Sequence, residues 1–264
     1  MLAGARRLAL RPVRAPARRA LLALCVLTGT LCATVAPGMA TPAQVVLDAQ
    51  YRDPTDRYNH AVLGDAAEWG ALSLRVDTCP GCALLRVSEV IIRLPDTRVF
   101  EDIAPRLIDL DFDDAPEVVV IESDAGLGAR LAIYDAEGFV TGTPFIGTRF
   151  RWLAPLGAAD LDGDGAMDLA YIDRPHLAKI LRVWRYADRS LTEIASLNGL
   201  TNHKIGEDFI SGGIRTCGPV SEIITADANW QNVMTTKIEN GKLNARAIAP
   251  FKNSDSLTSA LNCP

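Results

Sequence analysis

The chain after residue 40 consists of short apolar stretches, many with β-branched residues, that are separated by turn-forming residues. Val118–Glu122 and Leu169–Asp173 are two such stretches. Thr235–Ile238 and Leu243–Ile248 flank the turn sequence Glu-Asn-Gly-Lys, which is typical of a β-hairpin. No amphipathic helix of about twelve or more residues stands out in this part, so the pattern predicts an all-β fold.

The apolar stretches recur at a spacing of 51 positions in the middle of the chain. Asp109–Glu117 aligns without gaps with Asp160–Asp168. The flanking sequences align at the same spacing, with residues 97–99 and 129–135 matching residues 148–150 and 180–186. A period near 50 residues indicates a stacked or radial repeat.

Two further copies of the repeat are more degenerate. Residues 221–227 resemble the apolar stretches that follow the loops at 109–117 and 160–168, and residues 63–77 form a weak first copy. We therefore divide residues 41–264, taken as one domain, into four units and a tail, with approximate bounds of 58–98, 99–149, 150–201, 202–250 and 251–264. Four strands per unit at this period predict a β-propeller of about four blades, with Gln44–Asp48 completing the last blade if the ring closes.

The loop at residues 160–168 has the composition of a calcium site. Carboxylates stand at its positions 1, 3, 5 and 9, and Gly165 stands at position 6, where the chain must turn sharply. Ca²⁺ takes six to eight oxygen ligands, whereas Mg²⁺ prefers a tighter octahedral shell that keeps several waters. The predicted ligands are the side chains of Asp160, Asp162, Asp164 and Asp168 and the carbonyl of Ala166. The alternative is a solvated acidic turn.

A second calcium site is predicted in the aligned loop of the preceding unit. Asp114 replaces the turn glycine there, and an aspartate tolerates a left-handed backbone better than most residues. The ligands would be the side chains of Asp109, Asp111, Asp113 and Glu117 and the carbonyl of Ala115. Exported calcium modules bind at about 0.1–1 mM, so both ions are expected to rigidify the fold rather than to signal.

The segment Asp160–Asp168 with its flanking strands resembles the FG-GAP/VCBS repeat, the blade of the integrin α-chain propeller and of many secreted bacterial proteins. The resemblance covers about 100 residues, in the second and third units, and the chain lacks clear Phe-Gly and Gly-Ala-Pro signatures. It implies a four-stranded blade with the calcium loop between its first and second strands.

The opposite face of such a blade is where we expect a ligand. Loops that enter the first strand and leave the second strand share this face, which we call the mouth. Its candidate ligand-binding residues are Arg98, Glu122, Arg149, Arg151, Asp173 and Asp227. The alternative is that these residues cap turns and form salt bridges between blades.

An enzyme is the alternative function. His60 and His203 each follow an asparagine in loops of the first and last copies, which are neighbours in a closed ring. A small propeller hydrolase or lyase would use His60, His203, Glu207 and Asp208 in acid–base roles at the mouth. No Gly-x-Ser-x-Gly elbow or phosphate loop is present, so the sequence favours a binding or scaffold module.

Residues 1–40 have the three-part pattern of a cleaved signal peptide. Six arginines precede an apolar run from Ala20 to Ala36, and Gly38 and Ala40 suit a cleavage site. Removal of this segment changes the formal charge from −5 to −11. The expected protein is periplasmic or secreted, has no stable membrane insertion after cleavage, and binds no nucleic acid. Its ligand would be a protein, a peptide or a carbohydrate.

Four cysteines remain after residue 40, and an even number in an exported chain indicates disulfides. We favour Cys79–Cys82 and Cys217–Cys263 among the three possible pairings. Cys79-Pro80-Gly81-Cys82 also has the spacing of a redox pair or of half a zinc site. No βαβ unit and no second Cys-x-x-Cys accompanies it, so the structural disulfide is preferred.

Overall fold

The computed structural model describes residues 44–64 and 67–263, so the predicted signal peptide at residues 1–40 lies outside the described residues. Nearly all of the described elements are β-strands, and the all-β prediction is therefore confirmed. None of the helical structure in these two ranges is long and apolar enough to cross a membrane.

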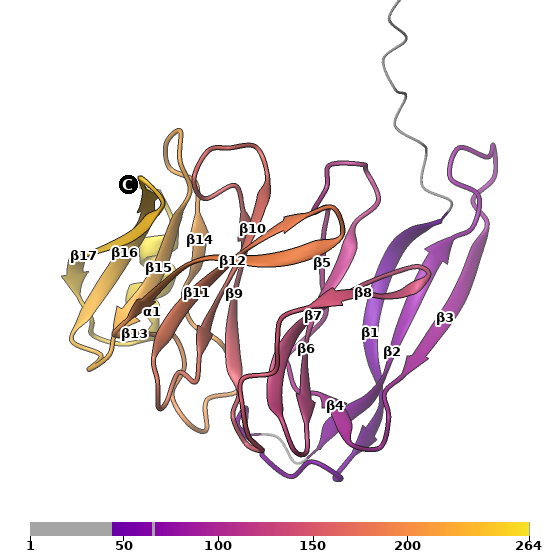
Figure 1. Cartoon of the computed structure of the whole chain (residues 1–264), viewed down its shortest axis with the longest axis horizontal. Helices are drawn as coiled ribbons and strands as arrows, with labels where there is room; N and C mark the ends of the chain where they lie inside the picture. Colours follow the sequence, from indigo (N-terminus) through magenta and orange to yellow (C-terminus); the bar gives the residue numbers. More distant parts are fainter. Residues whose placement is uncertain (1–43, 65–66, 264) are drawn as a thin grey trace, which may run out of the picture. The chain divides into compact units, whose positions relative to one another are not determined.

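Within the described residues, seventeen strands form three antiparallel sheets that lie side by side in chain order (Figure 1). The first sheet contains β1 (Val45–Thr55), β2 (Glu68–Asp77), β3 (Val87–Arg93), β4 (Arg98–Phe100), β5 (Arg106–Ile108), β6 (Glu117–Asp124), β7 (Gly128–Asp135) and β8 (Gly138–Gly142). The second contains β9 (Leu153–Ala159), β10 (Met167–Asp173), β11 (Ile180–Ala187) and β12 (Ser190–Asn198). The third contains β13 (Leu200–Thr201), β14 (Gly213–Arg215), β15 (Glu222–Asp227), β16 (Asn232–Glu239) and β17 (Lys242–Pro250).

The sheets repeat one pattern of connections. The acidic loop at 160–168 joins β9 to β10, and the loop at 109–117 joins β5 to β6, so each loop links the first strand of a unit to the second. In the second and fourth units the first strand is interrupted. There β4 and β5 both pair with β6, and β13 and β14 both pair with β15.

Alternation along the second strand of each unit builds the core. Val118 and Val120 of β6 pack towards β2, whereas Val119 and Ile121 pack towards β10. In the same way β10 packs Leu169 and Tyr171 towards β6, and its intervening residues towards the third sheet. Both faces of these strands are buried, which is why the sequence shows unbroken apolar runs there.

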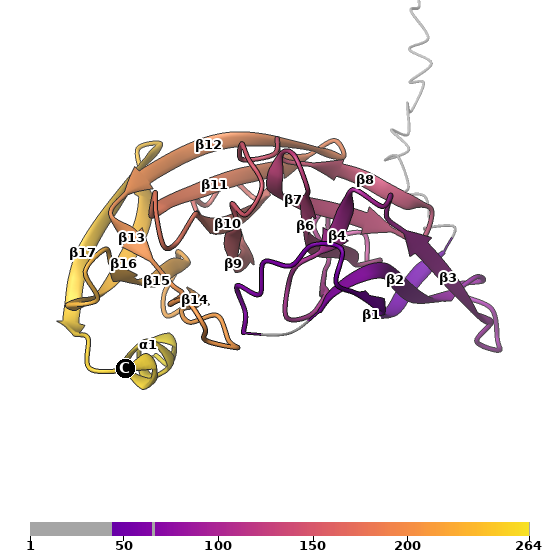
Figure 2. The ribbon, with the colours of Figure 1, turned by 90° about the horizontal axis from the view of Figure 1, so that it is seen from below.

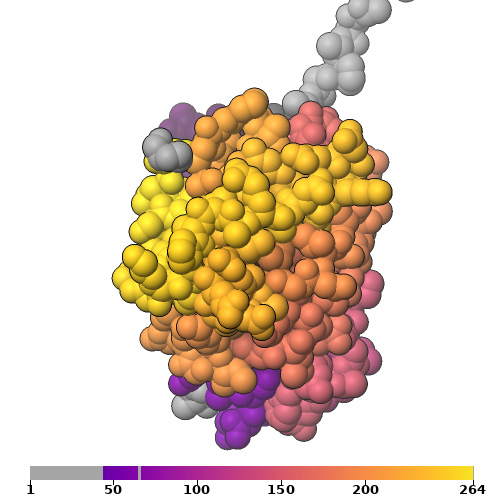
Figure 3. All heavy atoms as spheres, turned by 90° about the vertical axis from the view of Figure 1, so that its left-hand side faces the viewer, coloured from indigo at the N-terminus to yellow at the C-terminus, as the bar shows by residue number. Residues whose placement is uncertain are grey.

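A short helix covers the outer face of the last sheet. Helix α1 (Ser254–Leu261) packs its buried Leu257 against Ile224 and Val233. Cys263 lies at disulfide distance from Cys217, with 5.3 Å between the Cα atoms, and attaches the end of this segment to the third sheet. Figure 3 looks onto this side, which the C-terminal residues in yellow cover. The sequence pattern did not predict this helix, which is too short to show a clear periodicity.

The first unit differs from its prediction. β1 pairs with β2, from Val45–Asp77 to Thr55–Glu68, so the unit begins before residue 58 and Gln44–Asp48 does not complete the last blade. A register shift between Val46 and Asp48 disrupts the alternation that would have marked this strand. The first sheet also spans the first two units through the Trp69–Phe100 pair. In Figure 2, β1–β3 and β15–β17 lie at opposite ends of the row of sheets.

Candidate functional site

Asp160 organises the loop at 160–168. Its Oδ1 accepts a hydrogen bond from the Gly163 amide at 2.7 Å, and its Oδ2 accepts one from the Gly165 amide at 2.9 Å. Gly163 and Gly165 have φ values of +83° and +89°, a conformation that favours glycine. The loop therefore folds around the first of the predicted metal ligands.

Three of the predicted side-chain ligands converge in this loop, and an arginine lies among them. Carboxylate oxygens of Asp160, Asp162 and Asp168 lie within 4.8 Å of one another. The Arg185 guanidinium is 2.7 Å from Asp162 Oδ2, 2.5 Å from Asp164 Oδ2 and 3.0 Å from Asp168 Oδ1. Burial still raises the pKa of Asp168, although Arg185 opposes this shift. Ala166 donates its amide to Asp164 Oδ1 at 2.9 Å.

The loop at 109–117 follows the same path with different residues. Asp109 accepts hydrogen bonds from the amides of Asp113 and Asp114, and Asp113 accepts one from the amide of Ala115. Phe112 and Asp114 have φ values of +61° and +67°, at the positions that align with the two loop glycines. A positive φ at a residue other than glycine costs backbone energy. The contacts around this loop must therefore hold its backbone in place.

In the described part of the chain, no arginine or lysine balances the carboxylates of the loop at 109–117. Oxygens of Asp109, Asp111 and Glu117 lie within 4.8 Å of one another. Within residues 44–64 and 67–263, no arginine or lysine forms an ion pair with these three residues or with Asp113. Burial, with help from the charges of Asp111 and Asp113, raises the pKa of Glu117 to about 7, against a hydrogen bond from the Leu110 amide.

The acidic character continues beside this loop. A cavity of about 210 Å³ is lined by Asp111, Asp113, Glu117, Asp135 and Glu137, and also by Arg189. Arg189 binds Asp135 at 2.6 Å and leaves the loop carboxylates unpaired. The carboxylates of this loop could therefore hold a metal ion through oxygen ligands.

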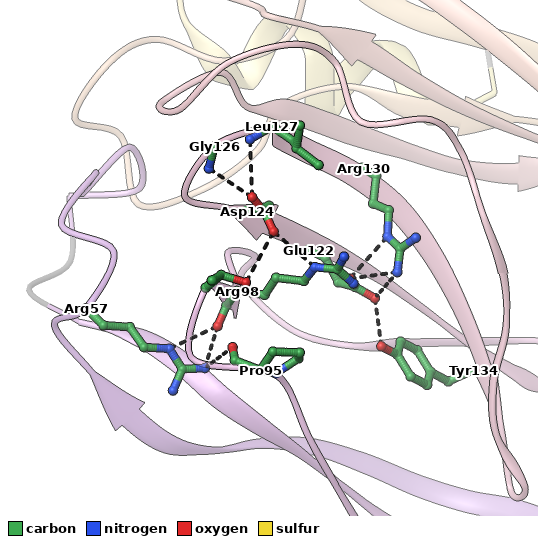
Figure 4. A network of polar contacts seen from close by, with 10 residues as sticks. Arg57, Pro95, Arg98, Glu122, Asp124, Gly126, Leu127, Arg130 and Tyr134 are labelled. Carbon is green, nitrogen blue, oxygen red and sulfur yellow. Dashed lines mark hydrogen bonds and ion pairs between the residues drawn. The ribbon is translucent and has the colours of Figure 1, made fainter.

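Two of the predicted mouth residues, Arg98 and Glu122, belong to one network of polar contacts (Figure 4). Glu122 is fully buried and accepts hydrogen bonds from Arg130 at 2.9 Å and from the Tyr134 hydroxyl at 2.7 Å. Arg98 lies 3.7 Å from Glu122 and donates to Asp124 at 3.1 Å. These polar groups therefore satisfy one another within the first sheet.

Two further predicted mouth residues also have polar partners. Asp173 is paired with Arg174 at 2.7 Å and with Arg182 at 3.0 Å. Asp227 caps a turn by accepting hydrogen bonds from the amides of Asn229 and Gln231. The exposed Arg149 lies over the ring of Phe150, and Arg151 donates to the Phe150 carbonyl.

The residues of the predicted acid–base set do not assemble as one group. His203 is buried and donates from Nε2 to the backbone carbonyl of Glu207 at 3.0 Å, whereas the Glu207 carboxylate accepts from the Lys204 amide. Asp208 is exposed. His60 instead contacts the fully buried Glu101, with 2.5 Å between Nδ1 and Oε1.

A third histidine, which the sequence argument did not assign, joins this side of the protein. His176 Nε2 lies 2.9 Å from His203 Nδ1. Burial and the neighbouring His203, His60 and Lys179 lower the pKa of His176 to about 4. Burial likewise lowers the pKa of His203. No local motif marks His176, and its contact with His203 depends on the packing of two sheets.

The comparison with protein families identifies one repeat. Residues 109–171 match the sequence model of the FG-GAP-like repeat, and the match includes both acidic loops. No curated protein matches the chain.

Proposed function

Because the chain carries an FG-GAP-like repeat, which suggests a β-propeller-like binding module, we propose that it is an exported module stabilised by calcium. The carrying observation is the convergence of Asp109, Asp111 and Glu117 without a balancing cation. Ca²⁺ would supply that charge, with oxygen ligands from the loop at 109–117 and, more weakly, from the loop at 160–168. A stabilising role fits the position of both loops between adjacent strands of one sheet.

The experiment is a thermal melt of the purified protein in calcium and in EDTA. An ion that binds only the folded protein stabilises it by about 2.7 kcal/mol at a hundredfold excess over Kd. For a protein of this size we expect EDTA to lower the Tm by about 5–10 °C. An unchanged Tm, together with no calcium by elemental analysis, would contradict the proposal.

A pair of variants makes this experiment specific. Asp109→Asn removes a ligand from the loop at 109–117 and should remove most of the calcium-dependent shift. Asp96→Asn removes a carboxylate whose side chain is fully exposed, and it should leave the shift unchanged. Equal shifts in the two variants would mean that calcium acts through the general negative charge of the surface.

Export is supported by two features. The pattern of residues 1–40 is that of a signal peptide, and the cysteine pairs Cys79–Cys82 and Cys217–Cys263 lie at disulfide distance. Disulfides form and persist in oxidising compartments. When the full chain is expressed in a bacterium, the periplasmic or secreted fraction should contain a protein that begins at Thr41. A chain that keeps residue 1 and remains in the cytoplasm would contradict export.

The proposed ligand is a protein, a peptide or a carbohydrate that binds on the side of the histidines. Large apolar side chains are exposed on the loops of that side, namely Ile103, Phe150, Leu177, Ile205 and Phe209. Exposed apolar and aromatic groups next to Arg149 and Arg151 suit such a ligand. A ligand found on peptide or glycan arrays should lose affinity in Phe150→Ser, and equal binding by that variant would move the site elsewhere.

A further inference from the structure

All three histidines of the chain meet on one side of the protein, although each comes from a different unit. His60 precedes β2, His176 lies between β10 and β11, and His203 lies between β13 and β14. The loops of the first and last units touch there, since a Cβ added to Gly64 would lie 3.2 Å from the carbonyl oxygen of Gly206. His60 and His176 line one cavity of about 30 Å³ with Trp152 and Arg174.

The surroundings of His60 fix which of its nitrogens faces a ligand. Nδ1 donates to the buried carboxylate of Glu101 at 2.5 Å, and that carboxylate also accepts from the Ser123 hydroxyl. Nε2 of neutral His60 therefore keeps its lone pair. The Phe150 ring stacks on the imidazole, with 5.0 Å between centroids, and restricts its rotation.

The neighbouring imidazole of His203 determines which nitrogen of His176 carries the proton. A carbonyl oxygen only accepts, so His203 must carry its proton on Nε2 to donate to Glu207. Nδ1 of neutral His203 is then an acceptor, and His176 must donate to it from Nε2. The lone pair of His176 therefore lies on Nδ1.

We propose that His60 Nε2 and His176 Nδ1 bind one divalent transition-metal ion of the Zn²⁺ or Cu²⁺ class. A metal-binding histidine characteristically donates its other N–H to a carboxylate or another acceptor, which fixes the tautomer and the ring. Glu101 and His203 are the positioning residues in these roles. Imidazole ligands select Zn²⁺ and Cu²⁺, whereas Ca²⁺ requires oxygen, so this site goes beyond the proposed calcium function and does not depend on it.

The charges around the cavity are mixed. Asp173 neutralises Arg174 through contacts of 2.7 and 3.0 Å, and Glu101 contributes a buried negative charge behind His60. Arg151 also lines the cavity, where it donates to the Phe150 carbonyl. With two protein ligands, the remaining positions of the ion are left to water or to donor groups of a bound molecule. The site would thus add metal coordination to the proposed ligand-binding side.

The test is calorimetric titration of the full protein with Zn²⁺ in saturating Ca²⁺, which occupies the acidic loops. We expect one strong site per chain that is lost in His60→Ala and in His176→Ala. Asp160→Asn is the matched control, because it alters the loop at 160–168 alone and should leave Zn²⁺ binding unchanged. If calcium binding fails but Zn²⁺ binding persists, only the proposed function is wrong.

A second measurement protects the test against misfolded variants. Nitrogen-15 NMR of the wild-type imidazoles should show Zn²⁺-dependent shifts of His60 Nε2 and His176 Nδ1, with the tautomer of His203 unchanged. Glu101→Gln should weaken Zn²⁺ binding about 10–100-fold, as expected for the loss of an outer hydrogen-bond partner. The absence of Zn²⁺-dependent shifts, or equal affinity in the wild type and both histidine variants, overturns the proposal.

Discussion

The loops at 109–117 and 160–168 share a backbone path and three converging carboxylates, but they face different residues on the neighbouring strand. Asp168 pairs across the sheet with Arg185, which binds it at 3.0 Å. The register that pairs Val118 with Tyr134 places Asp135 level with Glu117. The loop that best fits a calcium motif thus has Arg185 among its carboxylates, whereas the carboxylates at 109–117 form no ion pair with an arginine or lysine of the described residues. If the loops bind calcium as proposed, the cross-strand neighbour, rather than the loop sequence, would set how strongly the stability of each loop depends on the ion.

The fourth unit extends this comparison. Its loop has lost the earlier carboxylates, and Glu222 occupies the place of Glu117 and Asp168. Lys237 on the next strand binds Glu222 at 2.7 Å, and Arg215 binds it at 2.6 Å. Burial acts to raise the pKa of Glu222, but the hydrogen bonds from Lys237, Arg215 and Thr235 outweigh it and lower the pKa to about 2. Arg215 and Lys237 thus balance the charge of the buried carboxylate in the fourth unit, which is the role proposed for a calcium ion in the second unit.

The largest expected effect is the pH dependence of the calcium-free protein. The pKa of Glu117 rises from 4.5 to about 7 on folding, so the folded protein binds more protons than the unfolded chain between these pH values. The free energy of unfolding in EDTA should therefore fall as pH rises from 4.5 to 7, by at most about 3 kcal/mol. Urea unfolding at a series of pH values measures this fall.

Two controls isolate Glu117. Glu117→Gln should remove the fall, because the amide does not ionise. Saturating Ca²⁺ should also remove it, since a bound ion favours the ionised carboxylate. If stability in EDTA falls equally in the wild type and in Glu117→Gln, the buried charge lies elsewhere and the contrast between the loops fails.

The next largest effect is expected on the free energy of unfolding when Arg185 of the third unit is replaced. Arg185→Gln leaves the fully buried Asp168 without its partner, and breaking a buried ion pair costs about 3–5 kcal/mol. Since the Arg185 side chain is 22% exposed, solvent screening reduces the expected loss to about 2 kcal/mol in EDTA. Calcium should restore most of this loss, because the ion can take the place of the guanidinium.

A matched arginine gives the reference for this variant. Arg189→Gln removes the ion pair with Asp135, in which the arginine side chain is 58% exposed, and should cost less than about 1 kcal/mol. Urea unfolding of both variants with and without calcium makes the comparison. A deficit in Arg185→Gln that calcium does not reduce would show that Arg185 does not substitute for an ion.

These contrasts show which parts of the protein the sequence could predict. The spacing of 51 residues predicted the recurring strands and the position of both loops, because the loops and second strands are contiguous in the chain. The same spacing aligns Arg185 with Tyr134 rather than with Asp135. The hairpins differ by one residue, since Asp168 pairs with Arg185 whereas Val118 pairs with Tyr134. Side chains that meet across strands or sheets depend on such registers, and for this reason the sequence does not predict the contacts of Arg185 and His176.

The smallest effect is expected from transferring the cation to the second unit. Asp135→Arg places a guanidinium level with Glu117, as Arg185 stands to Asp168. Calcium affinity of the loop at 109–117 should fall about tenfold, and stability in EDTA should rise by about 1 kcal/mol. Asp135→Asn is the control, because it also releases Arg189 but adds no cation. If calcium titrations give the same affinity for the two variants, an arginine at position 135 does not replace the ion. The proposed calcium dependence of the loop at 109–117 would then have another cause. A difference between them would instead show that one cross-strand position can exchange a metal for an arginine within the same fold.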